Sequence, residues 1–358
     1  MTFRKKRMAL LASIAILVLV AVLDVWITKD ALFEKFGRQF INEAKTEAYW
    51  QAKRGAEATA ERQLDIDSQG IREVLLAGER SHMTVKRAPG RTIQLRYTVT
   101  ANAAESDAAE RKRDAVLIEK DIREGRLSLA ATAEGRPVDP DSVSIDYELL
   151  LPDALKLRIE SKSGSIRIQG VVADMDAASE NGSLEIVDVA GAVSVRTSYG
   201  SLYMANIKGS VSLENLSSEA IAEGIQGAFG FESRSGRNDI AGVTGTVSGS
   251  AEKGSVRLNE IAGPVEMHGR AAKLQLSEIR NQIRVMSELG DLKLVLPEAV
   301  GYAVDAKVRS GRIRTHLPFP VEPRPDEGGG SQLKGVVGTG TWKVDVEAHS
   351  ADIQIHTQ

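Results

Sequence analysis

The chain has no cysteine among its 358 residues. This absence excludes a disulfide framework, a lipid-modified cysteine, a cysteine-ligated zinc site and a thiol nucleophile. Aromatic residues are also scarce, at 4% of the sequence, so a large aromatic core is not expected. Glycine, in contrast, occurs 32 times. Many glycines with few aromatics favour regular tight turns and a repeat fold in which each repeat is thin.

An excess of charge of one sign is missing as well. The 46 Lys and Arg residues stand against 49 Asp and Glu residues, and the formal net charge is −3. Such a chain lacks the broad cationic field that concentrates nucleic acid near a protein. No nucleic-acid partner is therefore predicted.

One long apolar run is present, at residues 8–27, and its one ionisable member, Asp24, lies near its end. A helix needs about 20 apolar residues to cross a bilayer, so this run is predicted to be a transmembrane anchor. Four basic residues lie in the preceding segment 1–7, which predicts a cytoplasmic tail and an extracytoplasmic location for the rest. A cleavable signal peptide is the alternative, but the end of the run offers no small-x-small cleavage site.

Two segments separate this anchor from the repeats. Residues 28–62 are predicted to form a juxtamembrane helix, because Phe33, Phe36 and Phe40 recur at helical spacing. Residues 63–160 are predicted to be a β-rich capping segment of short alternating runs, interrupted at 103–115 by a polar, exposed helix or long loop. Its strands should cover the first repeat, because an open end would expose unpaired backbone groups.

A period of 18 residues runs through residues 161–296, which are predicted to be the solenoid repeats. Glycines or small residues mark one column: Gly164, Gly182, Gly200, Ser218, Gly236, Gly254, Ala272 and Gly290. A second column lies nine residues later: Gly191, Gly209, Gly227, Gly245 and Gly263. Because glycine adopts positive φ without steric cost, both columns are predicted to mark sharp turns in coils of two halves.

Apolar residues follow the same grid with two-residue alternation, which indicates strands with one buried face. One such column contains Ile168, Ile186, Met204, Ile240, Leu258, Leu276 and Leu294. The predicted fold class is mainly β: a two-sided β-solenoid with 18-residue coils, preceded by the transmembrane and juxtamembrane helices.

The fifth coil departs from the apolar pattern. Asn238 and Gly249 stand where apolar residues belong, and the column neighbours of Asn238 are Ala220 and Val256. Neither neighbour has a side chain that can hydrogen-bond to a buried amide. The sequence therefore predicts a locally loosened coil.

Residues 297–358 are predicted to form C-terminal strands and a cap. A strand is expected over 302–308, and the Pro- and Gly-rich stretch 318–331 is expected to be an exposed connection. Alternation from 338 to 356 predicts a final hairpin-like cap.

No enzyme active site is predicted, and no catalytic, cofactor-binding or metal-binding residue is assigned. A hexapeptide acyltransferase needs apolar residues where this chain has the polar column of Ser165, Ser183 and Ser201. A calcium-binding β-roll needs Asp in the sixth position of each half-repeat, and here that position holds Val187, Arg196, Ala205, Glu214 and Glu232.

The remaining polar and aromatic candidates are isolated in the sequence. The five histidines, His82, His268, His316, His349 and His356, share neither a repeat column nor a metal-binding spacing. Tyr203 and Ile221 are predicted to stack on the outer face, where they form either a contact patch or ordinary surface.

The repeats resemble a family of bacterial adhesin-like β-strand-repeat proteins that carry a domain of unknown function. The resemblance rests on Ser163-Gly164-Ser165-Ile166, Asn181-Gly182-Ser183-Leu184, Lys253-Gly254-Ser255-Val256, Leu289-Gly290-Asp291-Leu292 and Ser310-Gly311-Arg312-Ile313. It covers roughly Leu64 to His356 and implies the fold. The family has no established catalytic residues to transfer to this chain.

Three functions remain open at this point. The leading hypothesis is a non-enzymatic, adhesin-like or envelope-structural module that binds a cell-wall polymer, an envelope protein or another copy of itself. The second is an accessory sensor in cell-envelope stress signalling, which would act through contacts within the bilayer because the tail is so short. The third, a hydrolytic enzyme, lacks any supporting constellation of residues.

Overall fold

The computed structural model describes residues 55–324 and 329–358, which are mainly β. The predicted membrane anchor and most of the predicted juxtamembrane helix lie outside these residues. Within them, no helix is long and apolar enough to cross a membrane. The chain divides into two units, and the described residues of the first are 55–57 and 102–109. The second unit contains the repeats.

The capping segment contains more strands than the sequence predicts. Its elements are β1 (Ala56–Asp67), β2 (Glu73–Arg87), β3 (Thr92–Ala103), α2 (Ser106–Ala115), β4 (Val116–Arg123), β5 (Arg126–Ala133), β6 (Arg136–Pro137) and β7 (Val143–Leu151). The polar stretch at 103–115 is thus mostly helix. Strand β2 pairs in parallel with β5 and β7 and also with β8 (Lys156–Gln169), the first strand of the repeats. The edge of β8 is therefore covered, as the sequence predicts.

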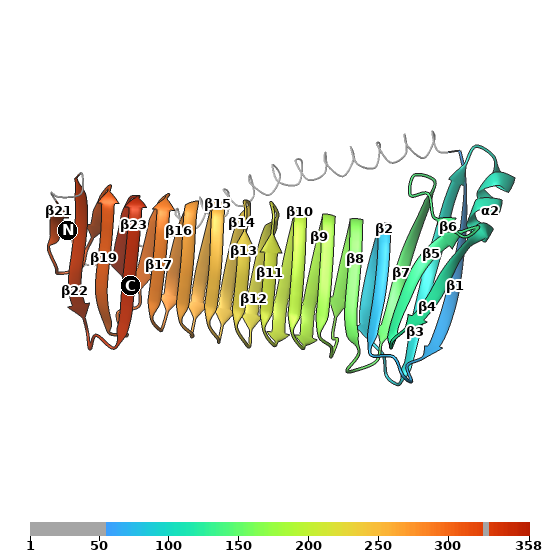
Figure 1. Cartoon of the computed structure of the whole chain (residues 1–358), viewed down its shortest axis with the longest axis horizontal. Helices are drawn as coiled ribbons and strands as arrows, with labels where there is room; N and C mark the ends of the chain where they lie inside the picture. The colour runs from blue at the N-terminus through green and yellow to red at the C-terminus, as the bar shows by residue number, and fades with distance from the viewer. Residues whose placement is uncertain (1–54, 325–328) are drawn as a thin grey trace, which may run out of the picture. The chain divides into compact units, whose positions relative to one another are not determined.

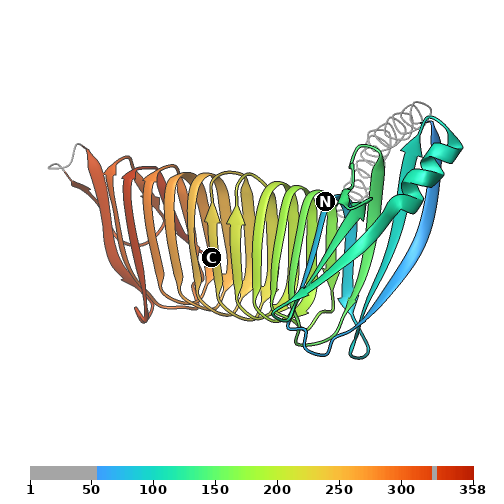
Figure 2. The same ribbon diagram turned by 45° about the vertical axis from the view of Figure 1, so that its right-hand side comes forward.

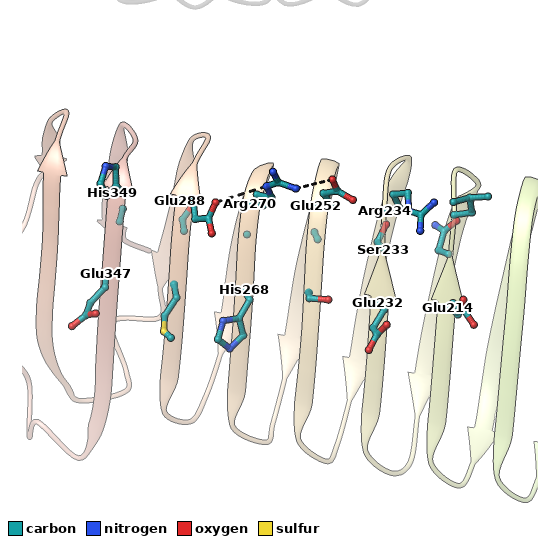
Figure 3. A pocket seen from close by; sticks show the side chains of 18 of the residues that line it. Glu214, Glu232, Ser233, Arg234, Glu252, His268, Arg270, Glu288, Glu347 and His349 are labelled. Atoms are coloured by element: carbon teal, nitrogen blue, oxygen red, sulfur yellow. Dashed lines mark hydrogen bonds and ion pairs between the residues drawn. The ribbon is translucent and has the colours of Figure 1, made fainter.

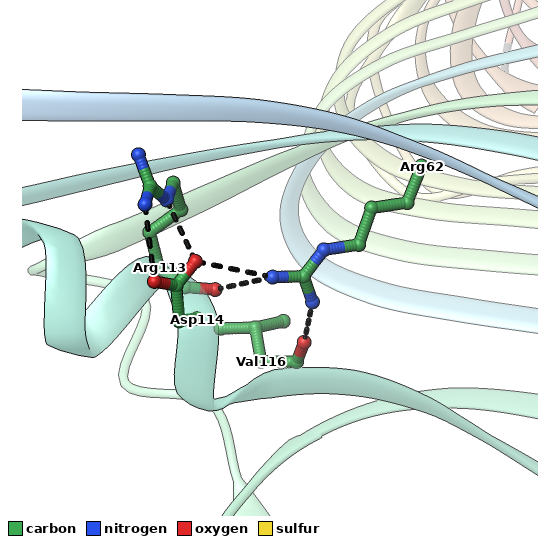
Figure 4. Close-up of polar contacts among 4 residues, drawn as sticks. All are labelled: Arg62, Arg113, Asp114 and Val116. Carbon is green, nitrogen blue, oxygen red and sulfur yellow. Dashed lines mark hydrogen bonds and ion pairs between the residues drawn. The ribbon is translucent and has the colours of Figure 1, made fainter.

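The helix predicted for 28–62 is wrong over its last residues, because strand β1 begins at Ala56. The alanine-rich sequence of β1 resembles a helix in composition, but its side chains alternate between the two faces of a strand. Arg62 holds β1 against the next elements: its guanidinium donates to the carbonyl oxygens of Val116 and Arg113, the second at 3.3 Å. It also lies 3.5 Å from the Asp114 carboxylate (Figure 4).

The repeats form a stack of coils in which each strand before β17 pairs in parallel with the strand segment 18 residues later. The strands are β8, β9 (Met175–Ala190), β10 (Val193–Lys208), β11 (Val211–Asn215), β12 (Glu219–Ile225), β13 (Phe229–Ser233), β14 (Arg237–Val243), β15 (Val247–Ile261), β16 (Val265–Ile279), β17 (Ile283–Leu289) and β18 (Leu292–Leu296). Val193, Val211, Phe229 and Val247 pair in succession, for example. The 18-residue period is confirmed, and successive strands lie side by side (Figures 1 and 2).

The two glycine columns differ in backbone conformation. In the first, Gly182 has a φ of 150° and Gly200 a φ of 115°, as the turn prediction requires. In the second, Gly191 has a φ of 153°, but Gly209, Gly227, Gly245 and Gly263 do not have positive φ, so the prediction is wrong at these four positions. A Cβ on Gly209 would instead lie 2.1 Å from the carbonyl oxygen of Gly191 in the preceding coil. The backbones of successive coils therefore approach too closely for a Cβ at Gly209, and the same holds in the first column, where a Cβ on Gly182 would lie 1.8 Å from the carbonyl oxygen of Gly164.

A third column of unusual backbone lies one residue before the buried corner and was not predicted. Its members have positive φ in every coil: Gly170, Asp188, Asn206, Gly224, Gly242, Glu260 and Glu278. Four of the seven carry side chains, so the column is hard to recognise in the sequence. Side chains stabilise this conformation in part, since Asn206 Nδ2 donates to Asp188 Oδ1 at 2.9 Å.

The fifth coil is not loosened, and that prediction is wrong. Asn238 is fully buried and keeps the parallel register on both sides. Its Oδ1 accepts a hydrogen bond from Asn215 Nδ2 at 2.8 Å, and its Nδ2 donates to Ser233 Oγ at 2.9 Å. Asn215 in turn binds both the backbone N and O of Ser218, whose hydroxyl lies 2.8 Å from Thr197 Oγ1. The partners of Asn238 come from the neighbouring corner rather than from its own column.

Gly249 also has a structural reason in this coil. It pairs with Phe231 on the adjacent strand, and a Cβ on Gly249 would lie 2.2 Å from the Phe231 ring. The missing side chain makes room for that ring, which is buried.

The C-terminal segment does not fold as a hairpin. Its strands are β19 (Tyr302–Ser310), β20 (Ile313–Thr315), β21 (Val321–Arg324), β22 (Gly330–Val337), β23 (Trp342–Ser350) and β24 (Ile353–Thr357). Strands β23 and β24 pair in parallel with β17 and β18 on one side and with β19 and β20 on the other. The last residues therefore form a coil inserted between two earlier ones.

The Pro- and Gly-rich connection is also partly strand. Strand β21 pairs antiparallel with β22, which pairs antiparallel with β19. Pro323 is tolerated in β21 because, among the described residues, this strand pairs along one of its edges only, with β22.

We predict that Asn238→Val lowers the free energy of unfolding by about 1–3 kcal/mol, because Asn215 and Ser233 lose a buried hydrogen-bond partner. Ser248→Val, on an exposed position of β15, should change it by no more than about 0.5 kcal/mol. Urea unfolding of the purified chain measures both. A variant at position 238 as stable as the wild type would contradict the role of the buried network.

Candidate binding groove along one corner of the coil stack

A groove of about 830 Å³ follows one corner of the coil stack and crosses β10, β11, β13, β15, β16, β17 and β23. Three adjacent residue columns form it. Its floor is a buried column of small or polar residues: Thr197, Asn215, Ser233, Ala251, Gly269, Ser287 and Ala348. The walls are the outward residues on either side of each floor residue (Figure 3).

The groove is hollow because of side-chain size. Ala251 and Gly269 occupy the floor where two coils meet, while the wall residues of the same coils are long, such as Glu252, His268 and Arg270. The parallel register repeats this contrast from coil to coil. The small residues of the floor column therefore leave a continuous groove between the longer wall residues.

One wall carries charges of alternating sign, and the other carries an ion pair followed by Glu232. Arg270 lies between Glu252 and Glu288, with its Nη1 3.0 Å from Glu252 Oε1 and its Nε 3.9 Å from Glu288 Oε2. On the other wall, Arg196 Nε lies 2.7 Å from Glu214 Oε2. These pairs are solvent-exposed and so contribute little to stability. Their groups can exchange one partner for another at small cost.

The middle of the groove presents charges without ion-pair partners. Among the described residues, no ion pair involves Glu232 or the guanidinium of Arg234, which lie in successive positions around Ser233. A carboxylate accepts hydrogen bonds and a guanidinium donates up to five. The groove can therefore bind hydroxyl, amide, carboxylate and amine groups of a ligand.

The sequence did not predict this groove. Its signal is the column of small and polar residues that begins at Ser161 and Ser179 and continues through the floor. In the sequence, such a column resembles the composition of ordinary turns. Only the strand register places charged side chains on both sides of it.

Tyr203 and Ile221, the candidate contact patch, lie elsewhere. They pair in register on β10 and β12 and line a smaller groove of about 390 Å³. The side chain of Tyr203 is 40% exposed. The same groove contains the Arg167–Glu185 ion pair, with a separation of 2.8 Å.

One histidine lies beside a serine in a way that the sequence did not suggest. His82 Nδ1 is 2.7 Å from Ser165 Oγ. The nearby Asp146 carboxylate accepts from the backbone N of His82 at 3.4 Å rather than from its ring. A nucleophilic triad requires the carboxylate to orient the imidazole, so this pair is a surface hydrogen bond.

Metal-ligating residues do not gather in larger groups in the described parts of the chain, where no cluster of three or more His, Cys, Asp or Glu could hold an ion. His316 and His356, however, are brought together by β20 and β24. His268 and His349 line the groove but lie in different coils.

No family model and no curated protein matches this chain. The solved structures that are similar to it include the following three. A candidate cell adhesion protein from Clostridium sporogenes has 10% identity and a TM-score of 0.24, over 84% of this chain and all of that one. A candidate adhesin from Parabacteroides merdae has 12% identity and a TM-score of 0.26, over 64% and 97%. A candidate adhesin from Parabacteroides distasonis has 10% identity and a TM-score of 0.26, over 84% and 97%.

Proposed function

We propose that this protein is a membrane-anchored, extracytoplasmic β-solenoid that acts as a non-enzymatic, adhesin-like binding module. The observation that carries the proposal is the long charged groove. Pockets for small molecules are usually enclosed and mostly apolar. This groove is open, lined by charged and polar side chains on its walls and spread over many coils, which suits an extended polymer better than a compact metabolite.

The ligand we favour is a cell-wall polymer with hydroxyl, amide and charged groups. Wall residues recur at the spacing of parallel strands, about 4.8 Å, so groups along an extended chain meet a similar environment in each coil. Arg234 and Arg270 on one wall can donate to carboxylates and carbonyls, while Glu232 on the other can accept from hydroxyls and amines.

Binding to purified wall sacculi tests this proposal. We predict that the double change Arg234→Ala and Arg270→Ala weakens cosedimentation of the purified chain by about tenfold or more, because hydrogen bonds to charged groups contribute about 1.5–3 kcal/mol. The double change Arg237→Ala and Arg257→Ala is the matched control, since both arginines are exposed and lie outside the groove.

An equal loss of binding in the control would indicate a general effect of net charge. No cosedimentation of the wild-type chain would reject a wall polymer as the ligand and leave an envelope protein or self-association.

The location of the module is part of the proposal. Residues 1–7 would lie in the cytoplasm, 8–27 in the membrane and the remainder outside. Protease added to intact, wall-stripped cells is therefore expected to degrade the coil stack while a tag placed before Met1 survives. Protection of the coil stack until the membrane is permeabilised would contradict the extracytoplasmic location.

A further inference from the structure

His316 and His356 lie side by side near the C-terminal end of the chain. Strands β20 and β24 pair in parallel with Ile313 opposite Ile353 and Thr315 opposite Ile355. His316 follows the last residue of β20, and His356 follows Ile355 in β24, so the register brings the two imidazoles together. Their Nδ1 atoms are 3.0 Å apart, and the ring centroids are 4.8 Å apart with an interplanar angle of 32°.

We propose that His316 and His356 form a two-histidine site for a borderline transition-metal ion, Cu²⁺ or Ni²⁺. Metal–imidazole bonds are about 2.0–2.1 Å long. Two nitrogens 3.0 Å apart at that distance from one ion subtend roughly 95° at it. This angle matches neighbouring positions of the square-planar and octahedral geometries that Cu²⁺ and Ni²⁺ adopt with imidazole ligands.

The groups around the two histidines affect how well they can bind a metal ion. Metal binding needs neutral imidazole, and burial, together with the charges of His316 and Lys293, lowers the pKa of His356. Lys293 lies on β18, two residues from the strand position that faces His356. Its positive charge opposes a bound cation, although its exposed side chain can turn into solvent. The described residues offer no third His, Cys, Asp or Glu to the pair, so water would complete the coordination.

A metal ion here would link two segments that are distant in the sequence. β24 belongs to the inserted coil, and β20 belongs to the coil that follows it in the stack. A ligand that binds the folded form alone stabilises it in proportion to its occupancy. Metal binding is therefore expected to hold the inserted C-terminal strands in place.

Titration of the purified, metal-free full-length chain with CuCl₂ or NiCl₂ tests the site. We expect saturable binding of one ion per chain by calorimetry and a rise in the melting temperature that chelator reverses. His316→Asn and His356→Asn should each remove both effects, whereas His349→Asn should retain them. Lys293→Gln should bind the ion more tightly than the wild type, because a nearby positive charge is removed.

The melting curves of the metal-free variants report whether each one folds. Retention of one-to-one binding in His316→Asn and His356→Asn, or the absence of saturable binding in the wild type, would overturn the proposal. Either result would leave the groove and its polymer ligand unaffected, because the two sites share no residue.

Discussion

Close contact between the backbones of successive coils is the constraint on which the rest of the structure depends. Parallel strands pair along each coil, and at both glycine columns the backbones of successive coils come closer than a Cβ allows. The Cβ positions of Gly209, Gly227, Gly245 and Gly263 lie 2.1–2.5 Å from a carbonyl oxygen of the coil before. Glycine at most positions of both columns is therefore a steric requirement of the close stacking of successive coils.

The parallel register determines which kind of side chain gathers on each face of the coil stack. A residue type that recurs every 18 positions becomes a ladder, whether it is apolar in the core, charged on a wall or small on the groove floor. The buried network around Asn238 illustrates the same rule for polar groups, since its partners are supplied by corners of adjacent coils. The groove and the core are thus products of one register, and the exposed ion pairs of the groove walls contribute little to stability.

The period, the buried columns and the covered first strand could be predicted from the sequence, because each depends on local alternation and on glycine spacing. The inserted C-terminal coil could not, because its pairing joins β24 to β18 and β20 across long stretches of chain with no shared period. The same long-range pairing brings His316 to His356, which no sequence spacing indicates. Strand β1 was mistaken for helix because alanine-rich composition outweighed its two-residue alternation, and the groove was missed because its floor resembles turn sequence.

The most direct test of this account compares two glycines of the same stack. Gly209→Ala places a Cβ against the Gly191 carbonyl oxygen, whereas Gly230→Ala places one on an open strand face, with its nearest neighbour 3.8 Å away. Urea unfolding of the purified chain should show a loss of about 1–3 kcal/mol or more for the first variant. The second should be unchanged or up to about 1 kcal/mol more stable. Equal stability of the two variants would contradict the claim that backbone contact at the mid-coil corner governs stacking.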